Sequence, residues 1–258
     1  MKLSLIIPAY KKEKVIGTQL TRIYNFLEKR EPDFELLVVV DGHVDNTLEV
    51  VKDLVDSQGL NKIRIYDYKT NRGKGYAIRY GMKRAKGEII GFTDADTDIK
   101  LKSLDVALEK MGDNDTKAVI PSKLHPKSKV NVPLYRKIFT LGLVLITKTV
   151  LDLPAGVNDV LCGLKLFRKE VVEEMLPMLK IDRFATDIEI LYSLKVLGYR
   201  VAVVPFFAQI KSGSTITNIK QMMLILRDIL IIYSKAWGRR VKYLYKAISK
   251  VKLLPSIK

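Results

Sequence analysis

The sequence has few of the residues that build covalent cross-links or zinc sites. It contains one cysteine, Cys162, and two histidines, His43 and His125, among 258 residues. A single cysteine excludes an internal disulfide framework and is typical of a reducing compartment. One cysteine and two histidines are also too few for the usual four-ligand zinc set. Stability must therefore come from a hydrophobic core, for which the 48% share of hydrophobic residues is sufficient.

Long hydrophobic runs are missing as well. The longest central apolar stretch, residues 138–147 (IFTLGLVLIT), is far shorter than the ~20 residues that a membrane-spanning helix needs. The apolar run at the N-terminus ends at Pro8, and no small-residue cleavage site follows it. We therefore expect neither a signal peptide nor a spanning helix.

Basic residues outnumber acidic ones, and the basic residues are unevenly distributed along the chain. The chain has 45 Lys and Arg against 28 Asp and Glu, a net charge of +17. From Lys235 to Lys258 there are eight Lys or Arg residues and no acidic residue. Such a segment fits nucleic acid, an anionic membrane surface, or solubility alone.

Strand and helix patterns alternate along the chain. Strands are expected at residues 3–8, 34–41, 62–68, 88–94, 117–122, 163–169 and 199–206, and helices at 12–30, 45–57, 75–87 and 186–198. Near-continuous apolar strands separated by helices imply a mainly parallel sheet covered on both faces. We predict an α/β, Rossmann-like domain over residues 1–217, followed by a basic amphipathic helical extension over 218–258.

Negative charge gathers at the end of one predicted strand. Asp94, Asp96 and Asp98 alternate directly after the run EIIGF. Alternate residues of a strand share a face, so two carboxylates at its end can converge on one ion. Mg²⁺ takes one or two carboxylates, together with water and substrate phosphate. Solvated turn residues are the other interpretation, but ligands bind at the carboxyl ends of parallel strands, which favours a metal site.

The segment NRGKG, residues 71–75, precedes a predicted helix. Backbone amides at a helix start attract anions, glycine permits close approach, and Lys74 adds positive charge. The spacing is neither that of a Walker loop nor GxGxxG. A loop of this kind is common, so by itself it indicates an anion contact only weakly.

Six segments together resemble a known family. They are IIPAY (6–10), VVVDGHVDNT (38–47), NRGKG (71–75), DAD (94–96), DVLCGLKLF (159–167) and FATDIEIL (184–191). In this order and spacing they resemble the family 2 glycosyltransferases of the GT-A fold, and within them the dolichyl-phosphate glucose and mannose synthases. The resemblance covers residues 3–215, and NRGKG and CGLKLF favour the glucose branch.

The resemblance implies a nucleotide-sugar donor, either UDP- or GDP-hexose, a divalent cation, Mg²⁺ or Mn²⁺, and a polyprenyl or dolichyl phosphate acceptor. It implies that Asp94 faces the ribose or sugar of the donor and that Asp96 and Asp98 ligate the metal. The other donor-binding residues that it implies are Pro8, Tyr10, Glu13, Asp41 and Lys74.

The resemblance also assigns catalytic and acceptor roles. Asp96, Asp187 and Glu189 are the implied catalytic residues, and Lys123 and Arg136 are implied to bind the acceptor phosphate. Asp187 and Glu189 would serve as a base if the acceptor were a hydroxyl; they could equally position the donor sugar or cap a helix.

Three departures from the family pattern concern the same site. Lys11 and Lys12 stand where family members usually have Asn-Glu, and residues 40–43 read Val-Asp-Gly-His in place of Asp-Asp-Gly-Ser. Leu161 replaces the glutamine of the glucose type. The first two departures affect the nucleotide contacts, and the third affects the assignment of the sugar.

The chemistry of sugar transfer gives the acids after EIIGF and the acceptor separate requirements. Breaking the sugar–phosphate bond leaves a diphosphate with extra negative charge, which a divalent cation stabilises. A hydroxyl acceptor needs a general base, whereas a lipid phosphate is already ionised. We therefore predict an inverting, metal-dependent transfer of glucose or mannose to dolichyl or polyprenyl phosphate.

A polyprenyl phosphate must be taken from a membrane. Residues 132–151 and 219–253 combine apolar and basic residues, with Trp237, Tyr243 and Tyr245 among the cations of the second segment. Such segments lie in membrane interfaces, where each cation near an anionic surface adds on the order of 1 kcal/mol. We predict a cytoplasmic protein bound peripherally to the anionic inner face of the membrane. An amphipathic helix packed on the domain, or an oligomer contact, is the alternative for each segment.

Three other functions stay open. A transferase of the same fold could use a hydroxyl on a glycan or a lipid-linked saccharide. The charge permits a nucleic-acid-binding module, but no recognised binding motif is present and we predict no nucleic-acid partner. A non-catalytic partner subunit is the third alternative, because Asn-Glu and Asp-Asp are lost.

Overall fold

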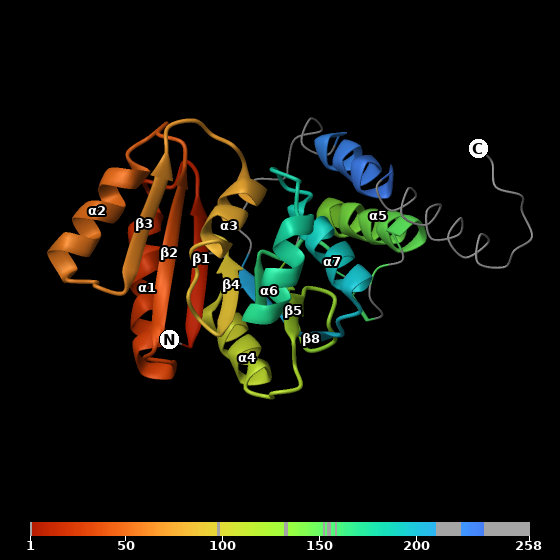
Figure 1. The fold of residues 1–258 in the computed structure, drawn as a ribbon, viewed down its shortest axis with the longest axis horizontal. Helices are drawn as coiled ribbons and strands as arrows, with labels where there is room; N and C mark the ends of the chain where they lie inside the picture. Colours follow the sequence, from red (N-terminus) through yellow and green to blue (C-terminus); the bar gives the residue numbers. More distant parts are fainter. Residues whose placement is uncertain are drawn as a thin grey trace, which may run out of the picture.

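The computed structural model describes residues 2–96, 99–131, 134–151, 153, 156–157, 159–209 and 223–234. Over these residues the chain forms a seven-stranded sheet in the order β3-β2-β1-β4-β7-β5-β8, with β6 and β9 paired beside it (Figure 1). The strands are β1 (Leu3–Ala9), β2 (Phe34–Asp41), β3 (Ile63–Tyr68), β4 (Ile89–Thr93), β5 (Ala118–Ser122), β6 (Lys129–Asn131), β7 (Leu164–Arg168), β8 (Val201–Pro205) and β9 (Phe207–Gln209).

The sheet is mainly parallel, as the sequence predicts. Strands β1 to β4 pair in parallel, and β5 pairs in parallel with β8. Strand β7 runs antiparallel to both of its neighbours, β4 and β5. The amino end of β7 therefore lies at the same edge of the sheet as the carboxyl ends of the parallel strands.

Helices cover both faces of the sheet, and the strands are apolar on both sides for that reason. The helices are α1 (Ile16–Arg30), α2 (Thr47–Gln58), α3 (Lys74–Met82), α4 (Leu101–Met111), α5 (Leu134–Leu151), α6 (Lys169–Met175) and α7 (Thr186–Leu197), with a 3₁₀ turn at Leu176–Met178. In β1, Leu5 and Ile7 pack with residues of α1, α2 and α4. Ile6, between them, packs with residues of α3, α6 and α7 on the opposite face.

Helix α3 is shorter than the sequence pattern indicates. The predicted helix runs to Gly87, but α3 ends at Met82. The buried pair Ser4 and Glu35, joined at 2.6 Å, accepts hydrogen bonds from the backbone amides of Lys86 and Gly87. These bonds hold the backbone of residues 86–87 in the segment that leads into β4, so the helix ends before it reaches Gly87. The predicted end of α7 at Gly198 is confirmed, with that glycine in the left-handed region (φ 79°).

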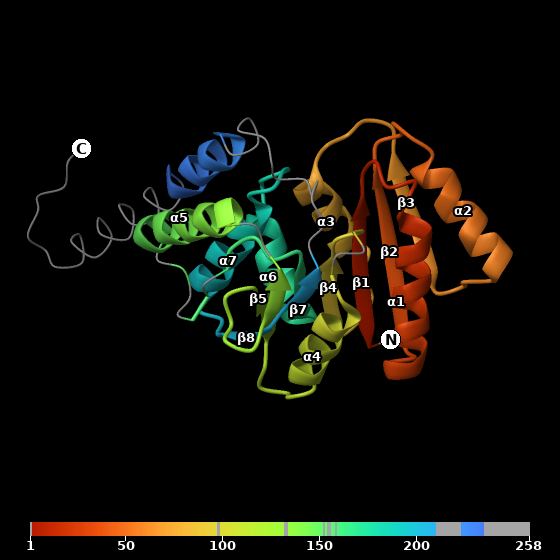
Figure 2. The ribbon, with the colours of Figure 1, turned by 180° about the vertical axis from the view of Figure 1, so that it is seen from behind.

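The helix of residues 223–234 packs on the domain beside α5, at the far end of the molecule from α2 (Figures 1 and 2). Ile225, Ile229 and Ile232 are at most 2% exposed and share a core with Leu143 and Val144 of α5. This part of the predicted extension therefore has one buried face. The predicted boundary at residue 217 and the basic segment after residue 234, including Trp237, Tyr243 and Tyr245, lie outside the described residues. Within the described part of the chain, no helix combines the length and apolar character needed to cross a bilayer.

Neighbouring residues of this helix test its packing. Ile229→Ala should lower the free energy of unfolding by about 2–5 kcal/mol, because it leaves a cavity in the core. Leu230, 65% exposed, should tolerate alanine within about 0.5 kcal/mol. Urea denaturation of both variants measures the difference. Equal small losses would mean that the helix is detached from the domain in solution.

Candidate active site

The candidate site lies where several chain ends meet at one edge of the sheet. The carboxyl ends of β1, β2 and β4 lead into the segments that carry Lys12, Asp41 and Asp94. The amino end of β7 and the first turns of α3 and α7 reach the same edge and bring Lys74 and Asp187. This arrangement follows from the parallel sheet, in which ligands bind at the carboxyl ends of the strands.

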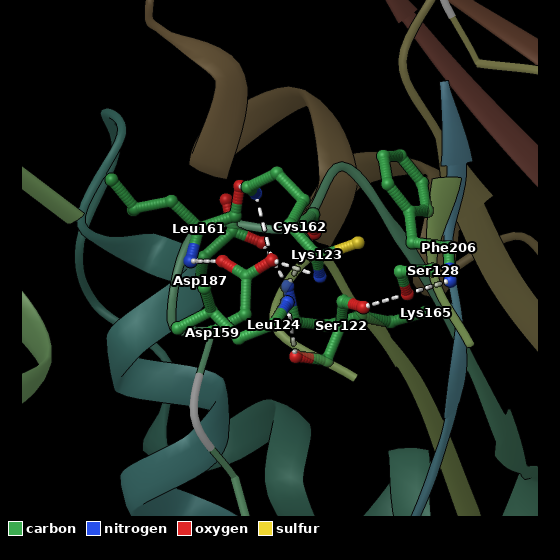
Figure 3. A network of polar contacts seen from close by, with 10 residues as sticks. All are labelled: Ser122, Lys123, Leu124, Ser128, Asp159, Leu161, Cys162, Lys165, Asp187 and Phe206. Atoms are coloured by element: carbon green, nitrogen blue, oxygen red, sulfur yellow. Dashed lines mark hydrogen bonds and ion pairs between the residues drawn. The ribbon is translucent and has the colours of Figure 1, made fainter. Parts of the chain in front are cut away.

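Acidic and basic side chains alternate through the site. Lys74 Nζ lies 2.8 Å from Asp94 Oδ1 and 3.4 Å from Asp187 Oδ2. The other oxygen of Asp187 pairs with Lys165, which is fully buried and also donates to the carbonyl of Cys162 at 2.6 Å. Lys165, Asp187 and Cys162 belong to the network of polar contacts drawn in Figure 3. The three charged side chains come from β7, α7 and α3, so distant parts of the sequence assemble this series.

Asp96 has its own cation. Lys12, from the loop after β1, forms an ion pair with Asp96 Oδ1. With this pair, three lysines, Lys12, Lys74 and Lys165, contact three aspartates, Asp94, Asp96 and Asp187. The negative charges of Asp94 and Asp96 are therefore offset, because each carboxylate faces an ammonium group.

The acids at the end of β4 fit a divalent cation that is shared with a substrate. Among the described residues, no group of three or more His, Cys, Asp or Glu side chains could hold a metal ion. Asp98, the third predicted acid, lies outside the described residues. Mg²⁺ is bound through one or two carboxylates together with substrate phosphates. Asp94 and Asp96, which are only partly exposed, can supply that number.

The buried charges fix the ionisation of Asp187. Burial would raise the pKa of Asp187, but the positive charges of Lys165 and Lys74 outweigh it and lower the pKa. Burial would likewise lower the pKa of Lys74, and the charges of Asp187 and Asp94 outweigh it and raise the pKa. Asp187 thus stabilises the fold above the unfolded pKa of about 4 and loses this contribution as pH falls through its folded pKa. At neutral pH it is an ionised, paired carboxylate and a poor proton acceptor.

Glu189, the second predicted base, is engaged in holding a turn. Its side chain is 3% exposed, and its Oε2 accepts hydrogen bonds from the backbone amides of Lys180 and Ile181 at 2.8 and 2.7 Å. These contacts position the segment 180–182, which packs against the start of α3. The geometry gives Glu189 a positioning role, and its catalytic role stays a prediction.

The glycines of the NRGKG segment allow two loops to touch. A Cβ atom on Gly73 would overlap the carbonyl oxygen of Asp182, and one on Gly75 would overlap that of Ile181. The amide of Tyr76 also donates to the Asp182 carbonyl at 3.1 Å. The close approach that glycine permits here is to the loop before α7, which brings Asp187 toward Lys74.

Asp41 holds the other side of the same loop. It is 3% exposed, and its carboxylate accepts hydrogen bonds from Asn71 Nδ2 at 2.8 Å and from the amides of Arg72 and Gly73 at 2.7 and 2.9 Å. These bonds position the segment that leads to Lys74. A direct donor contact for Asp41 stays a prediction.

The remaining predicted donor residues surround this edge. Pro8 is half-buried in β1, and Tyr10 is 40% exposed just after that strand. Glu13 joins the β1–α1 loop to the start of α2, because its Oε2 accepts a hydrogen bond from the Asn46 amide at 3.0 Å. Tyr10 is thus available at the surface, whereas Glu13 already has a structural partner.

Lys123, one of the two predicted acceptor residues, directly follows β5, which lies between β7 and β8 in the sheet. Lys123 Nζ is 2.8 Å from Asp159 Oδ2 and 3.1 Å from the carbonyl of Leu161 (Figure 3). Burial would lower the pKa of Lys123, but the charge of Asp159 outweighs it and raises the pKa. Arg136 belongs to the first turn of α5, and its side chain lies outside the described ones. Lys123 therefore stays charged at neutral pH, and the role of Arg136 stays a prediction.

The segment DVLCGLKLF contains three site residues to which the sequence analysis gave no role, namely Asp159, Gly163 and Lys165. Lys165 pairs with Asp187, Asp159 pairs with Lys123, and Gly163 makes room for Asp94. A single lysine inside the buried run GLKLF is the one local signal, because a charge there needs a partner. Lys12 stood out in the sequence only as a departure from the family pattern.

Comparison with known proteins gives a consistent result. The sequence profile of glycosyl transferase family 2 matches residues 4–176. Dolichyl-phosphate beta-glucosyltransferase of Dictyostelium discoideum is 30% identical over 241 residues, covering 89% of this chain and 73% of the relative. The Drosophila melanogaster protein of the same name is 30% identical over 245 residues, covering 90% and 74%.

A solved structure matches the fold. It is glucosyl-3-phosphoglycerate synthase from Mycobacterium tuberculosis in complex with Mn²⁺, UDP and phosphoglyceric acid, with a TM-score of 0.66 and 16% identity. The match covers 89% of this chain and 76% of that one. The central sheet and its helices are those of a GT-A fold, as the sequence predicts.

Gly163 provides a test of how Asp94 is held. A Cβ atom at this position would overlap Asp94 Oδ2, so Gly163→Ala should push the carboxylate away from Lys74 and lower donor turnover at least about tenfold. Gly142→Ala, on α5, is the matched control because nothing lies within 4 Å of its added methyl group. Steady-state kinetics of both variants, with circular dichroism to check folding, measure the effect. Equal turnover rates for Gly163→Ala and Gly142→Ala would show that turnover does not require the Asp94 carboxylate to be held beside Lys74.

Proposed function

We propose, since the chain belongs to glycosyl transferase family 2, that this glycosyltransferase moves glucose from a nucleoside diphosphate sugar to dolichyl or another polyprenyl phosphate. Two relatives at 30% identity are named dolichyl-phosphate beta-glucosyltransferase. Their name supplies the sugar and the acceptor of the proposal. The structural neighbour that binds UDP favours UDP-glucose as the donor.

The observation that carries the choice of acceptor is the pairing of Asp187 with two lysines. A hydroxyl acceptor must lose its proton to a general base in the transition state. Asp187 has a lowered pKa and contacts Lys165 and Lys74, while Glu189 holds the turn at residues 180–181. Neither predicted base offers a free carboxylate for proton abstraction. A phosphate acceptor needs no base, because its oxygen is already ionised near neutral pH.

The donor half of the reaction is proposed to use the acids at the end of β4. Asp96, with Asp98 as the second metal ligand that the resemblance implies, would hold Mg²⁺ or Mn²⁺ beside Asp94, and the cation supplies charge neutralisation for the diphosphate that leaves. Lys74 fixes the orientation of Asp94 through the 2.8 Å ion pair. Attack by the acceptor on the face of the sugar opposite the diphosphate would invert the anomeric carbon.

The acceptor phosphate is proposed to bind near Lys123. The Lys123 side chain is 16% exposed, and its ammonium group keeps its charge beside Asp159. Lys123 belongs to the same network of polar contacts as Lys165 and Asp187 (Figure 3). A second cation from the start of α5, Arg136, completes the proposed acceptor site.

The acceptor test is a product analysis with matched substrates. Purified protein is incubated with UDP-glucose or GDP-mannose, Mn²⁺ or Mg²⁺, and either a short polyprenyl phosphate or the corresponding alcohol. We expect a glucosylated lipid phosphate by mass spectrometry and no product with the alcohol. Asp96→Ala should abolish the product while leaving the circular dichroism spectrum unchanged. Transfer to a saccharide hydroxyl, with none to the lipid phosphate, would contradict the proposal.

An exposed apolar face supports a membrane position for the acceptor end. Helix α5 and residues 223–234 lie side by side, with their buried residues facing the core (Figures 1 and 2). Their exposed apolar residues form the outer face, namely Leu141, Leu145, Ile146, Met223, Leu226, Leu230 and Ile231. Leu145 and Leu230 are each 65% exposed, which is costly in water and favourable at a membrane interface.

Charge introduced on this outer face tests the membrane contact. The double variant Leu145→Glu, Leu230→Glu should lower partitioning onto vesicles with anionic lipid at least about tenfold, since it removes apolar area and adds repulsion. Val196→Glu is the control, because Val196 is 44% exposed on α7, outside the outer face. Vesicle sedimentation measures bound protein. If all three proteins sediment equally, the outer face serves another purpose.

A further inference from the structure

We propose that Lys12 and a divalent cation are alternative occupants of the Asp96 carboxylate. Lys12 then sets how tightly the metal binds before the donor arrives. This inference rests on the proposed function, which places a cation at Asp96, beside Asp94. It assigns a role to a lysine that in the sequence stands out only as a departure from the family pattern.

The backbone around Lys12 is held in a defined place. The amide of Lys12 donates to Thr47 Oγ1 at 2.8 Å, and that hydroxyl donates to Asp45 Oδ1 at 2.6 Å. Glu13 is joined to the same turn through its own amide, which donates to Asp45 Oδ2 at 3.3 Å. The loop after β1 is thus fastened to the start of α2, and Lys12 is not on a loose surface loop.

The preceding residue adopts a conformation that needs such support. Lys11 has φ 53°, and it is the one non-glycine residue with positive φ in the described part of the chain. A lysine in the left-handed region is uncommon and persists where the surroundings fix it. The turn directs the Lys12 side chain across the sheet edge to Asp96, 84 positions away in the sequence.

Charge balance makes the two occupants exclusive. In the described structure Asp96 faces Lys12, and Asp94 faces Lys74. A divalent cation bound to Asp96 would add two positive charges beside the Lys12 ammonium group, and like charges at contact distance repel strongly. The ammonium group must therefore move away when the metal binds. The lysine stem has four rotatable methylene groups, and the side chain is 22% exposed, so this movement is open to it.

The diphosphate of the donor offers a new partner for the Lys12 ammonium group. A nucleoside diphosphate brings negative charge to the place where the metal enters. Lys12, displaced from Asp96, can then contact the diphosphate, and the site regains its balance. The inference therefore predicts weak metal binding to the free protein and stronger binding once the diphosphate is present.

Binding of Mn²⁺ alone tests the exclusion without any transfer reaction. Free Mn²⁺ is measured by electron paramagnetic resonance during titration of the full chain without nucleotide. Lys12→Met should bind Mn²⁺ at least about tenfold more tightly than the wild type, because the competing charge is gone. Lys14→Met is the matched control: it removes one lysine charge from an exposed position two residues away and should bind like the wild type. Adding Asp96→Asn to the wild type or to Lys12→Met should abolish Mn²⁺ binding, because the carboxylate that binds the cation is gone.

Two results would overturn the inference. One is equal Mn²⁺ affinity of Lys12→Met and the wild type, including no binding by either. The other is an equal gain in Lys12→Met and Lys14→Met, which would show only a change in net charge. Lys12→Gln, measured in parallel and checked by thermal unfolding, gives the same comparison if Lys12→Met is unstable. Failure of glucosyl transfer in the product analysis would refute the proposed function, and the Mn²⁺ comparison would still decide the role of Lys12.

Discussion

The arrangement of the site depends on one buried interaction, the contact of Asp187 with Lys165 and Lys74. Lys165 is fully buried in β7, where an unpaired ammonium group would be very costly. Its pairing with Asp187 fixes α7 against the sheet, and the second oxygen of Asp187 fixes Lys74. Lys74 then places Asp94, so the position of a residue at the surface of the site is set by a charge deep in the core.

Close packing of loops makes this series of contacts possible. Gly73 and Gly75 let the start of α3 touch the segment before α7, and Gly163 lets the start of β7 pass beside Asp94. Asp41 holds the same α3 loop from β2 through three hydrogen bonds. The start of α3, the segment before α7 and the start of β7 are therefore held in fixed positions at the site. Transfer chemistry requires such preorganised geometry.

The balance of charge connects the site with its substrates. The three lysines and three aspartates that contact one another form a group of six side chains without net charge. A divalent cation and a diphosphate that enter together preserve the neutrality. In this view the lysine at position 12 makes cation binding dependent on the donor.

The alternation of apolar strands and helices, read from the sequence, determined the mainly parallel sheet and the placing of Asp94 and Asp96 at its carboxyl edge. These features depend on local periodicity, which each segment carries by itself. Local periodicity could not predict that α3 ends before Gly87, because this end depends on Ser4 and Glu35 from other strands. Which lysine faces which acid depends instead on how the whole chain packs. Those partners lie 20 to 113 positions apart, and their meeting depends on how distant strands and helices pack.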